Sequence, residues 1–143
     1  MPDVLLLNGP NLRLLGTRQP EIYGTTTLAD VEAGVAAAVA DAGWKVAAFQ
    51  SDSEAELIRI IEEHYDSAGM IINPGALMMA GWPLRDALAS YPRPIVEVHI
   101  SNVWAREPFR HESVISAVVD GVIAGLGTDG YRLAALALLE RSA

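Results

Sequence analysis

The stretch that decides the fold is "DVLLLNGPNLRLLGTRQPEIYG", residues 3–24. Its first part, DVLLLN (3–8), is an almost continuous apolar run, which is typical of a strand buried on both faces of a parallel sheet. From Asn8 to Gly24 the chain then carries two Asn, two Arg and a Tyr in one long connection. Connections in α/β units usually take about 2–6 residues, and longer ones are often functional. We therefore expect this loop to carry the chemistry of the protein.

Apolar strand patterns alternate with helical patterns along the rest of the chain. We expect strands at 3–8, 44–51, 68–75, 93–101 and 120–127, and helices at 25–43, 53–67, 83–91 and 129–143. Ser53 followed by Glu56 is a capping-box pattern, and Pro83 suits a first helical turn. Strands that alternate with helices form a parallel sheet covered on both faces. The simplest right-handed arrangement is flavodoxin-like, with strand order 2-1-3-4-5, in a single domain spanning residues 1–143.

Composition excludes several classes of function. The net charge of −8 argues against nucleic acid and anionic membrane as partners, because both require a basic face. There is no apolar run of about 18 residues and no basic leader with a cleavage site, so we expect neither a membrane span nor a signal peptide. The absence of Cys removes disulfides, thiol nucleophiles and thiolate metal sites, and favours a cytoplasmic location. The single Lys, Lys45, lies at an expected strand start, which argues against Schiff-base chemistry.

Polar residues gather where the expected strands end. Ligands of open α/β sheets bind at this carboxyl edge. The residues at or just past these ends are Asn11, Arg18, Tyr23, Asn73, Glu97, His99, Ser101, Arg106 and Arg110. Arg binds carboxylates through paired N–H groups, so we expect a small acid as ligand. No cluster has metal-ligand spacing, and the first loop lacks both nucleotide-binding fingerprints, so we expect no metal and no bound nucleotide.

Two pairs in this set suit acid–base chemistry. Glu97 and His99 lie two apart on one strand and so share a face, where the carboxylate increases the basicity of the imidazole and fixes its tautomer. The alternative is an ion pair that only closes the sheet. Arg18 beside Tyr23 favours the phenolate, which can act as a base at neutral pH. The alternative for this second pair is a pair of ordinary surface residues.

Four motifs make the sequence similar to a known family. "LNGPNLRLLGTRQPEIYG", "INPGA", "LRDAL" and "VEVHISNVWAREPFRHES" resemble the type II 3-dehydroquinate dehydratases, and the resemblance runs from Val4 to about Leu139. It implies a flavodoxin-like fold and a dodecamer built of trimers. It also implies the cofactor-free, metal-free dehydration of 3-dehydroquinate to 3-dehydroshikimate, with anti geometry and through an enolate.

The resemblance assigns catalytic roles to five residues. Tyr23 is the expected base that takes a proton from C2 of the substrate, and Arg18 lowers its pKa. Asn11 holds the water that stabilises the enolate oxygen. His99, oriented by Glu97, is the expected acid that protonates the departing C1 hydroxyl.

The same resemblance assigns the binding residues for a cyclic carboxylate. Asn73 and the backbone N–H groups of Ile100 and Ser101 are expected to hold the carboxylate. Arg110 is expected to bind ring hydroxyls, and Asp86 to reach into the site of a neighbouring subunit.

One segment departs from the family pattern. Where the family usually continues from "NPGA" with Tyr or Phe and then "THTS", this chain has LMMAGWP (77–83), and Met79 aligns with a His that bonds substrate hydroxyls. Arg13 also replaces a common Asn. Neutral drift or a slower dehydroquinase is one interpretation; a related dehydratase for a less hydroxylated cyclic keto acid is another. A non-catalytic ligand-binding subunit remains a third, whereas a flavin protein is disfavoured because the first loop lacks a Ser/Thr-rich phosphate cradle.

Overall fold

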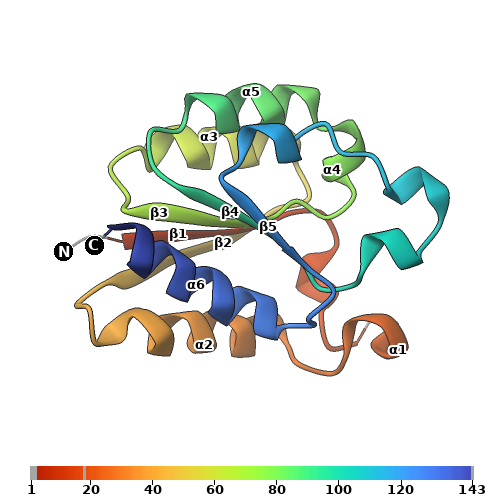
Figure 1. The fold of residues 1–143 in the computed structure, drawn as a ribbon, viewed down its shortest axis with the longest axis horizontal. Coiled ribbons are helices and arrows are strands. Elements are labelled where there is room, and N and C mark those ends of the chain that lie inside the picture. The colour runs from red at the N-terminus through yellow and green to blue at the C-terminus, as the bar shows by residue number, and fades with distance from the viewer. Residues whose placement is uncertain (1–2, 18, 143) are drawn as a thin grey trace.

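The computed structural model describes residues 3–17 and 19–142, and for Tyr23 it describes the backbone alone. Five strands form one parallel sheet in the order β2-β1-β3-β4-β5 (Figure 1). Their bounds are β1 (Asp3–Asn8), β2 (Lys45–Gln50), β3 (Gly69–Asn73), β4 (Ile95–His99) and β5 (Gly121–Ala124). The predicted flavodoxin-like order 2-1-3-4-5 is therefore confirmed.

Helices cover both faces of this sheet. The longer ones are α2 (Leu28–Ala40), α3 (Glu54–Glu63), α5 (Trp82–Ser90) and α6 (Asp129–Ser142), and the one-turn helices are α1 (Pro20–Tyr23) and α4 (Leu77–Ala80). Four 3-10 turns are η1 (Leu12–Leu14), η2 (Val103–Ala105), η3 (Pro108–Arg110) and η4 (Ser116–Val118). Figure 1 shows α2 and α6 on one face and α3 and α5 on the other. None of the described helices is long and apolar enough to cross a membrane.

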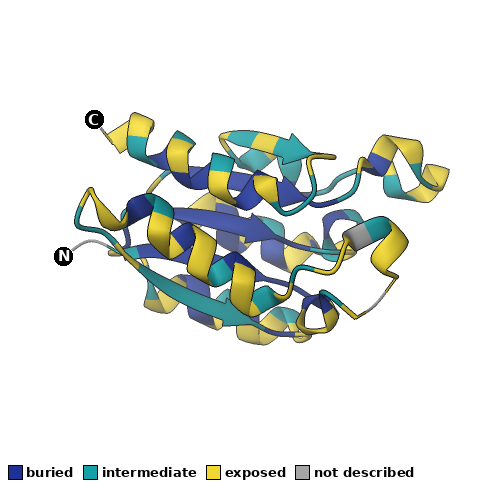
Figure 2. Cartoon of the chain, turned by 90° about the horizontal axis from the view of Figure 1, so that it is seen from below, coloured by how far each residue is buried: buried dark blue, intermediate teal, exposed yellow. Residues whose placement is uncertain are grey.

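Side chains of β1 alternate between the two core layers. Leu6 packs in the layer under α2 and α6, and Leu7 in the layer under α3 and α5. Because β1 is paired on both edges and covered on both faces, Val4 to Asn8 are buried, as the apolar run predicted. Figure 2 shows the buried residues on the strands and on the inner faces of the helices.

Side chains at the helix starts explain where two of the helices begin. Thr27 and Asp30 form a reciprocal capping box at α2, so this helix begins at Leu28 rather than at the predicted residue 25. At α3, Ser53 Oγ accepts the backbone N–H of Glu56 at 3.2 Å, as predicted. The backbone N–H of Ser53 instead donates to Ser51 Oγ at 3.0 Å. The predicted box is therefore only half formed.

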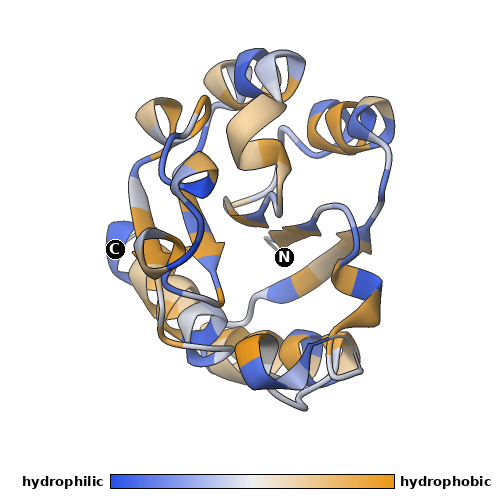
Figure 3. Cartoon of the chain, turned by 90° about the vertical axis from the view of Figure 1, so that its right-hand side faces the viewer, coloured by the Kyte–Doolittle hydropathy of each residue, from blue (hydrophilic) through white to orange (hydrophobic). Residues whose placement is uncertain are grey.

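The carboxyl ends of the strands all open at one edge of the sheet, on the right of Figure 1. Figure 3 looks onto this edge, where the loops that follow β1, β3 and β4 surround the strand ends. Strands β4 and β5 are shorter than the predicted 93–101 and 120–127, because the chain leaves the sheet early to form these loops. The one-turn helices and 3-10 turns were not predicted, since a single turn is too short to show a helical period.

Candidate active site

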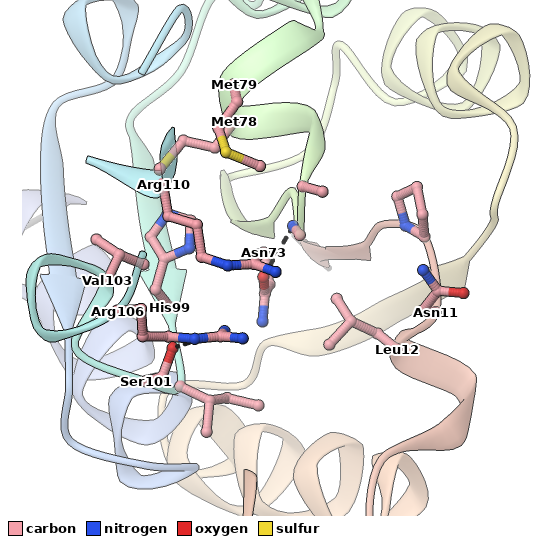
Figure 4. Close-up of a pocket in the computed structure, with 14 residues that line it drawn as sticks. Asn11, Leu12, Asn73, Met78, Met79, His99, Ser101, Val103, Arg106 and Arg110 are labelled. Carbon is pink, nitrogen blue, oxygen red and sulfur yellow. Dashed lines mark hydrogen bonds between the residues drawn. The ribbon is translucent and has the colours of Figure 1, made fainter. Parts of the chain in front are cut away.

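A pocket of about 120 Å³ lies between the loops that follow β1, β3 and β4 (Figure 4). Its lining residues are Pro10, Asn11, Leu12, Asn73, Gly75, Ala76, Met78, Met79, His99, Ile100, Ser101, Val103, Arg106 and Arg110. The predicted site residues among them are Asn11, Asn73, Met79, His99, Ile100, Ser101 and Arg110. The clustering expected from the strand ends is thus present in the structure.

Strand β4 places Glu97 directly behind His99. The carboxylate is completely buried, and its Oε2 accepts a hydrogen bond from Nε2 of the imidazole. A buried carboxylate requires such a partner, because an unpaired charge is costly to remove from water. With its proton on Nε2, the neutral ring has Nδ1 as its second, basic nitrogen. The shared face predicted for the pair is confirmed, and only His99 of the two lines the pocket.

A serine that the sequence analysis missed holds the other carboxylate oxygen. Ser116 Oγ, in η4, donates to Glu97 Oε1 at 2.8 Å. The Ser113 hydroxyl lies 2.7 Å from Ser116 Oγ, and Ser113 Oγ accepts the Ser116 backbone N–H at 2.9 Å. Both carboxylate oxygens of Glu97 are therefore occupied. The SVIS segment (113–116) carries no sequence signal for this role, because the contact depends on how η4 lies against β4.

Asn73 ends β3 and is buried at the centre of the pocket (Figure 4). Its Oδ1 accepts the backbone N–H of Gly75 at 3.1 Å, and its Nδ2 donates to Tyr131 Oη at 2.8 Å. The Tyr131 hydroxyl donates in turn to Asn8 Oδ1 at 2.6 Å. Burial raises the pKa of Tyr131, so the phenol stays neutral and keeps its proton for Asn8. Tyr131 and Asn8 were not predicted.

The loop after β1 is anchored by Asp52, which follows β2. Asn11 has a left-handed backbone with φ of 70°, and its N–H donates to Asp52 Oδ1 at 2.9 Å. Gln50 Nε2 donates to the same oxygen at 3.1 Å, and Arg13 binds Oδ2. The bond from Asn11 holds the pKa of the Asp52 carboxyl below its usual range, and Gln50 and Arg13 act in the same direction. The unusual Arg13 thus has a defined partner.

Two guanidinium groups give the pocket its positive charge. Arg106 Nη1 donates to Ser101 Oγ at 3.4 Å. The Cζ atom of Arg110 lies 4.9 Å from the centre of the Phe109 ring, and its Nε donates a hydrogen bond to Glu107. The bond from Arg110 lowers the pKa of Glu107, which therefore stays ionised. In a chain of net charge −8, these cations make the pocket suitable for an anion.

One wall of the pocket is apolar. Met78 and Met79 both line it from α4, and Val114 N–H donates to the backbone oxygen of Met78 at 2.7 Å. The divergent residue Met79 thus lies in the pocket lining beside Met78, and its part in substrate binding stays a prediction. Figure 4 shows the two methionines on the far side of the pocket from Asn11 and Leu12.

Besides Glu97, one predicted residue lies away from this pocket, and two others fall outside what the structure describes. Asp86 is exposed on α5 and does not line the pocket. Arg18 lies outside the described residues, and so does the side chain of Tyr23, whose backbone ends α1. In the part of the chain that is described, no group of three or more His, Asp or Glu could hold a metal ion.

Comparisons with known proteins match the chain over nearly its whole length. The sequence model of the family described as "Dehydroquinase class II" matches residues 2–139. A "3-dehydroquinate dehydratase" of Janthinobacterium sp. (strain Marseille) is 52% identical over 136 residues, 92% of each chain. A "Catabolic 3-dehydroquinase 2" of Aspergillus flavus is 52% identical and covers 98% of this chain and 94% of its own. The crystal structure of a type II dehydroquinase from Propionibacterium acnes superimposes with a TM-score of 0.90 at 44% identity, covering 99% and 97% of the two chains.

Proposed function

Since the chain belongs to the class II dehydroquinase family, we propose that it is a 3-dehydroquinate dehydratase, a lyase that converts 3-dehydroquinate to 3-dehydroshikimate. The observation that carries this proposal is the His99–Glu97 pair facing a pocket with amide and guanidinium donors. The names of full-length relatives support it independently. Residues 1–143 form one catalytic domain in this proposal.

The substrate carboxylate binds at the Asn73 side of the pocket. Asn73 has a second Nδ2–H beyond the one given to Tyr131, and a carboxylate accepts such a donor readily. The backbone N–H groups of Ile100 and Ser101 complete this carboxylate site. Arg110, which lies in the loop after β4, binds the hydroxyls of the substrate ring.

The reaction begins with removal of a proton from C2 by the phenolate of Tyr23, whose pKa is lowered by Arg18. The C2–H electrons form an enolate with the C3 carbonyl, and a water held by Asn11 stabilises the enolate oxygen. When the enolate collapses, C1=C2 forms and the C1–O bond breaks. The hydroxyl leaves from the opposite face, so the elimination is anti.

His99 protonates the departing hydroxyl, which leaves as water. The negative charge of Glu97 stabilises the protonated imidazole before this transfer, and Ser116 keeps the carboxylate in place. Every proton in the scheme moves between side chains, substrate and water, so the reaction requires no cofactor.

The other two functions have weaker support. A dehydratase for a less hydroxylated keto acid is suggested by the Met78–Met79 wall, but the relatives that share half of the sequence carry the dehydroquinate name. A non-catalytic subunit would not require the buried acid–base pair of His99 and Glu97.

We further infer a cytoplasmic dodecamer built of trimers, as the family resemblance implies. Two features support an assembly in which α5 meets another subunit. Asp86 is exposed on α5 away from the pocket of its own chain, and Trp82, at the start of the same helix, is 60% exposed.

Steady-state turnover of 3-dehydroquinate, followed by the ultraviolet absorbance of the conjugated enone product, tests the proposal. We expect turnover by the natural chain and a loss of at least a hundredfold in kcat for Tyr23→Phe, in line with about 10²–10⁴-fold for general base catalysis. Tyr65→Phe, which removes an exposed hydroxyl, is the matched control. Undiminished activity in Tyr23→Phe would remove the assigned base.

A further inference from the structure

A buried network of side-chain hydrogen bonds lies beneath the pocket and connects three elements of the fold. It consists of Asn8 at the end of β1, Asn73 at the end of β3 and Tyr131 in the first turn of α6. Asn8 and Asn73 are paired in the register of neighbouring strands, so their side chains project toward the same face, where α6 packs. All three are buried, with 0%, 3% and 1% of their surfaces exposed. Only Asn73 lines the pocket.

Gly75 at one end and Asn8 at the other together fix the direction of each hydrogen bond in this network. Gly75 N–H can only donate, so it requires the Oδ1 of Asn73 at 3.1 Å. Nδ2 of Asn73 therefore faces Tyr131, whose hydroxyl accepts from it at 2.8 Å. The single hydroxyl hydrogen then goes to Asn8 Oδ1, at 2.6 Å. Because Asn8 takes this hydrogen, Tyr131 can act toward Asn73 only as an acceptor.

This direction decides the sign of the interaction between Asn73 and an anion. In the observed orientation the second Nδ2–H is the group left over for a ligand, and an N–H attracts a carboxylate. In the flipped orientation a carbonyl lone pair would take its place and repel the same carboxylate. The network can therefore determine both the orientation of the Asn73 amide and the preference of the pocket for a carboxylate.

Stability alone does not account for the network. The Nδ2 of Asn8 is buried, and among the described residues it has no hydrogen-bond partner. An unsatisfied buried donor is destabilising, whereas an apolar residue of similar shape removes this penalty. Asn8 is therefore better explained by the oxygen that it presents to Tyr131.

We propose that Tyr131 and Asn8 are positioning residues that hold the Asn73 amide with an N–H toward the ligand, and so make the pocket selective for a carboxylate. The proposal rests on the proposed function, which assigns the substrate carboxylate to Asn73. Neither residue touches the substrate in this account. Both act through Asn73. Tyr131 accepts a hydrogen bond from the Asn73 amide, and Asn8 accepts the tyrosine's own hydrogen, so that the hydroxyl oxygen stays available as that acceptor.

The test compares two ligands that differ only in the group offered to Asn73: quinate, which has a carboxylate, and quinamide, which has a neutral amide in its place. We expect the natural chain to bind quinate more tightly than quinamide. Tyr131→Phe should weaken quinate binding about tenfold or more, the effect of one hydrogen bond to a charged group, and change quinamide binding less than twofold. KM for 3-dehydroquinate should rise by a similar factor, while kcat changes less than threefold.

A matched control and a second variant separate positioning from folding. Tyr91 is also buried, and its hydroxyl lies 2.6 Å from Ser67 Oγ near the opposite end of the sheet, so Tyr91→Phe removes an equivalent group away from the pocket. Binding of both inhibitors should be unchanged in this control. Asn8→Leu should reproduce the loss specific to quinate, because it frees the Tyr131 hydroxyl to donate to Asn73, and it removes the unsatisfied donor as well.

The outcomes distinguish this inference from the proposed function. Equal losses for quinate and quinamide, no loss at all, or no preference of the natural chain for quinate would overturn the inference. Absence of turnover by the natural chain would overturn the dehydratase proposal, and a loss specific to quinate in both variants would then still support the role of the network.

Discussion

The chemistry of the pocket depends on partners that lie one layer behind it. Glu97 is fully buried, and His99 and Ser116 each bind one of its oxygens. An ionised group in such a position is stable only while these bonds persist, because water cannot replace them. In the proposed mechanism the serine therefore acts through the orientation of the carboxylate and, beyond it, of the imidazole.

Ser116→Ala should lower kcat about tenfold and leave KM nearly unchanged. The reason is that the variant removes one hydrogen bond to a charged group, which is worth about 1.5–3 kcal/mol, at a residue away from the substrate. Steady-state kinetics check this expectation, with Ser142→Ala at the exposed end of α6 as the control. A rise in KM without a fall in kcat would contradict the orienting role.

Met79→His should raise kcat/KM for 3-dehydroquinate about three- to tenfold. The new ring nitrogen can bond a substrate hydroxyl that faces an apolar wall in the natural chain, and such a bond is worth about 0.5–1.5 kcal/mol. Met79→Leu, which keeps the wall apolar, is the matched control. If both variants behave alike, the methionine wall does not limit the use of this substrate.

At the scale of elements, the loop after β1 is held by the end of β2. Asp52 fixes the left-handed Asn11 through its backbone N–H and also binds Arg13. Non-glycine residues with positive φ are uncommon, and Asn is among the types that tolerate it. The loop that carries the expected water-binding residue is therefore anchored by a side chain that follows a different strand.

Asp52→Ala should accelerate hydrogen exchange at the Asn11 amide at least tenfold, whereas Asp52→Asn, which keeps an acceptor, should have a smaller effect. Mass spectrometry of peptides covering residues 9–15 measures this, with the exposed Asp41→Ala as the control. Because the folded-state pKa of Asp52 is lowered, the anchor is present above the unfolded pKa of 3.8 and is lost as the pH falls through the folded pKa. Equal exchange in both variants near pH 7 would contradict the anchor.

The elements that carry long patterns were predictable, and the supports of the site were not. The apolar run of β1 predicted a strand, and the spacing of apolar residues in α3 predicted a helix. The polar residues at the strand ends correctly placed Asn11, Asn73 and His99 at the pocket. The turn that forms α4 is too short for a pattern. Tyr131 meets Asn8 across 123 positions of sequence, a contact that only the packing of α6 on the sheet creates.

At the scale of the whole molecule, buried tyrosines predict the response to alkali. Burial raises the pKa of both Tyr131 and Tyr91, so the folded state holds these protons at a pH where the unfolded chain has released them. Their contribution to stability is fully present below the unfolded pKa of 10 and is lost as the pH rises above it.

The free energy of unfolding should therefore fall above pH 10, by up to about 1.4 kcal/mol per pH unit for each such tyrosine. Urea denaturation between pH 7 and pH 11 measures this slope. Tyr131→Phe should make the slope shallower, whatever it does to stability at pH 7. An unchanged slope would mean that the hydroxyl ionises in the folded state as readily as in the unfolded chain.

The strand order brings the described groups of the proposed reaction, among them Asn11, Asn73 and His99, to one edge of one sheet, so the central claim concerns the elimination at that edge. The most direct test is dehydration of 3-dehydroquinate that carries deuterium at C2 on the face opposite the C1 hydroxyl. An anti elimination predicts turnover to 3-dehydroshikimate without deuterium, because the base removes the label to solvent. Product that retains the label, or no product, would contradict the account.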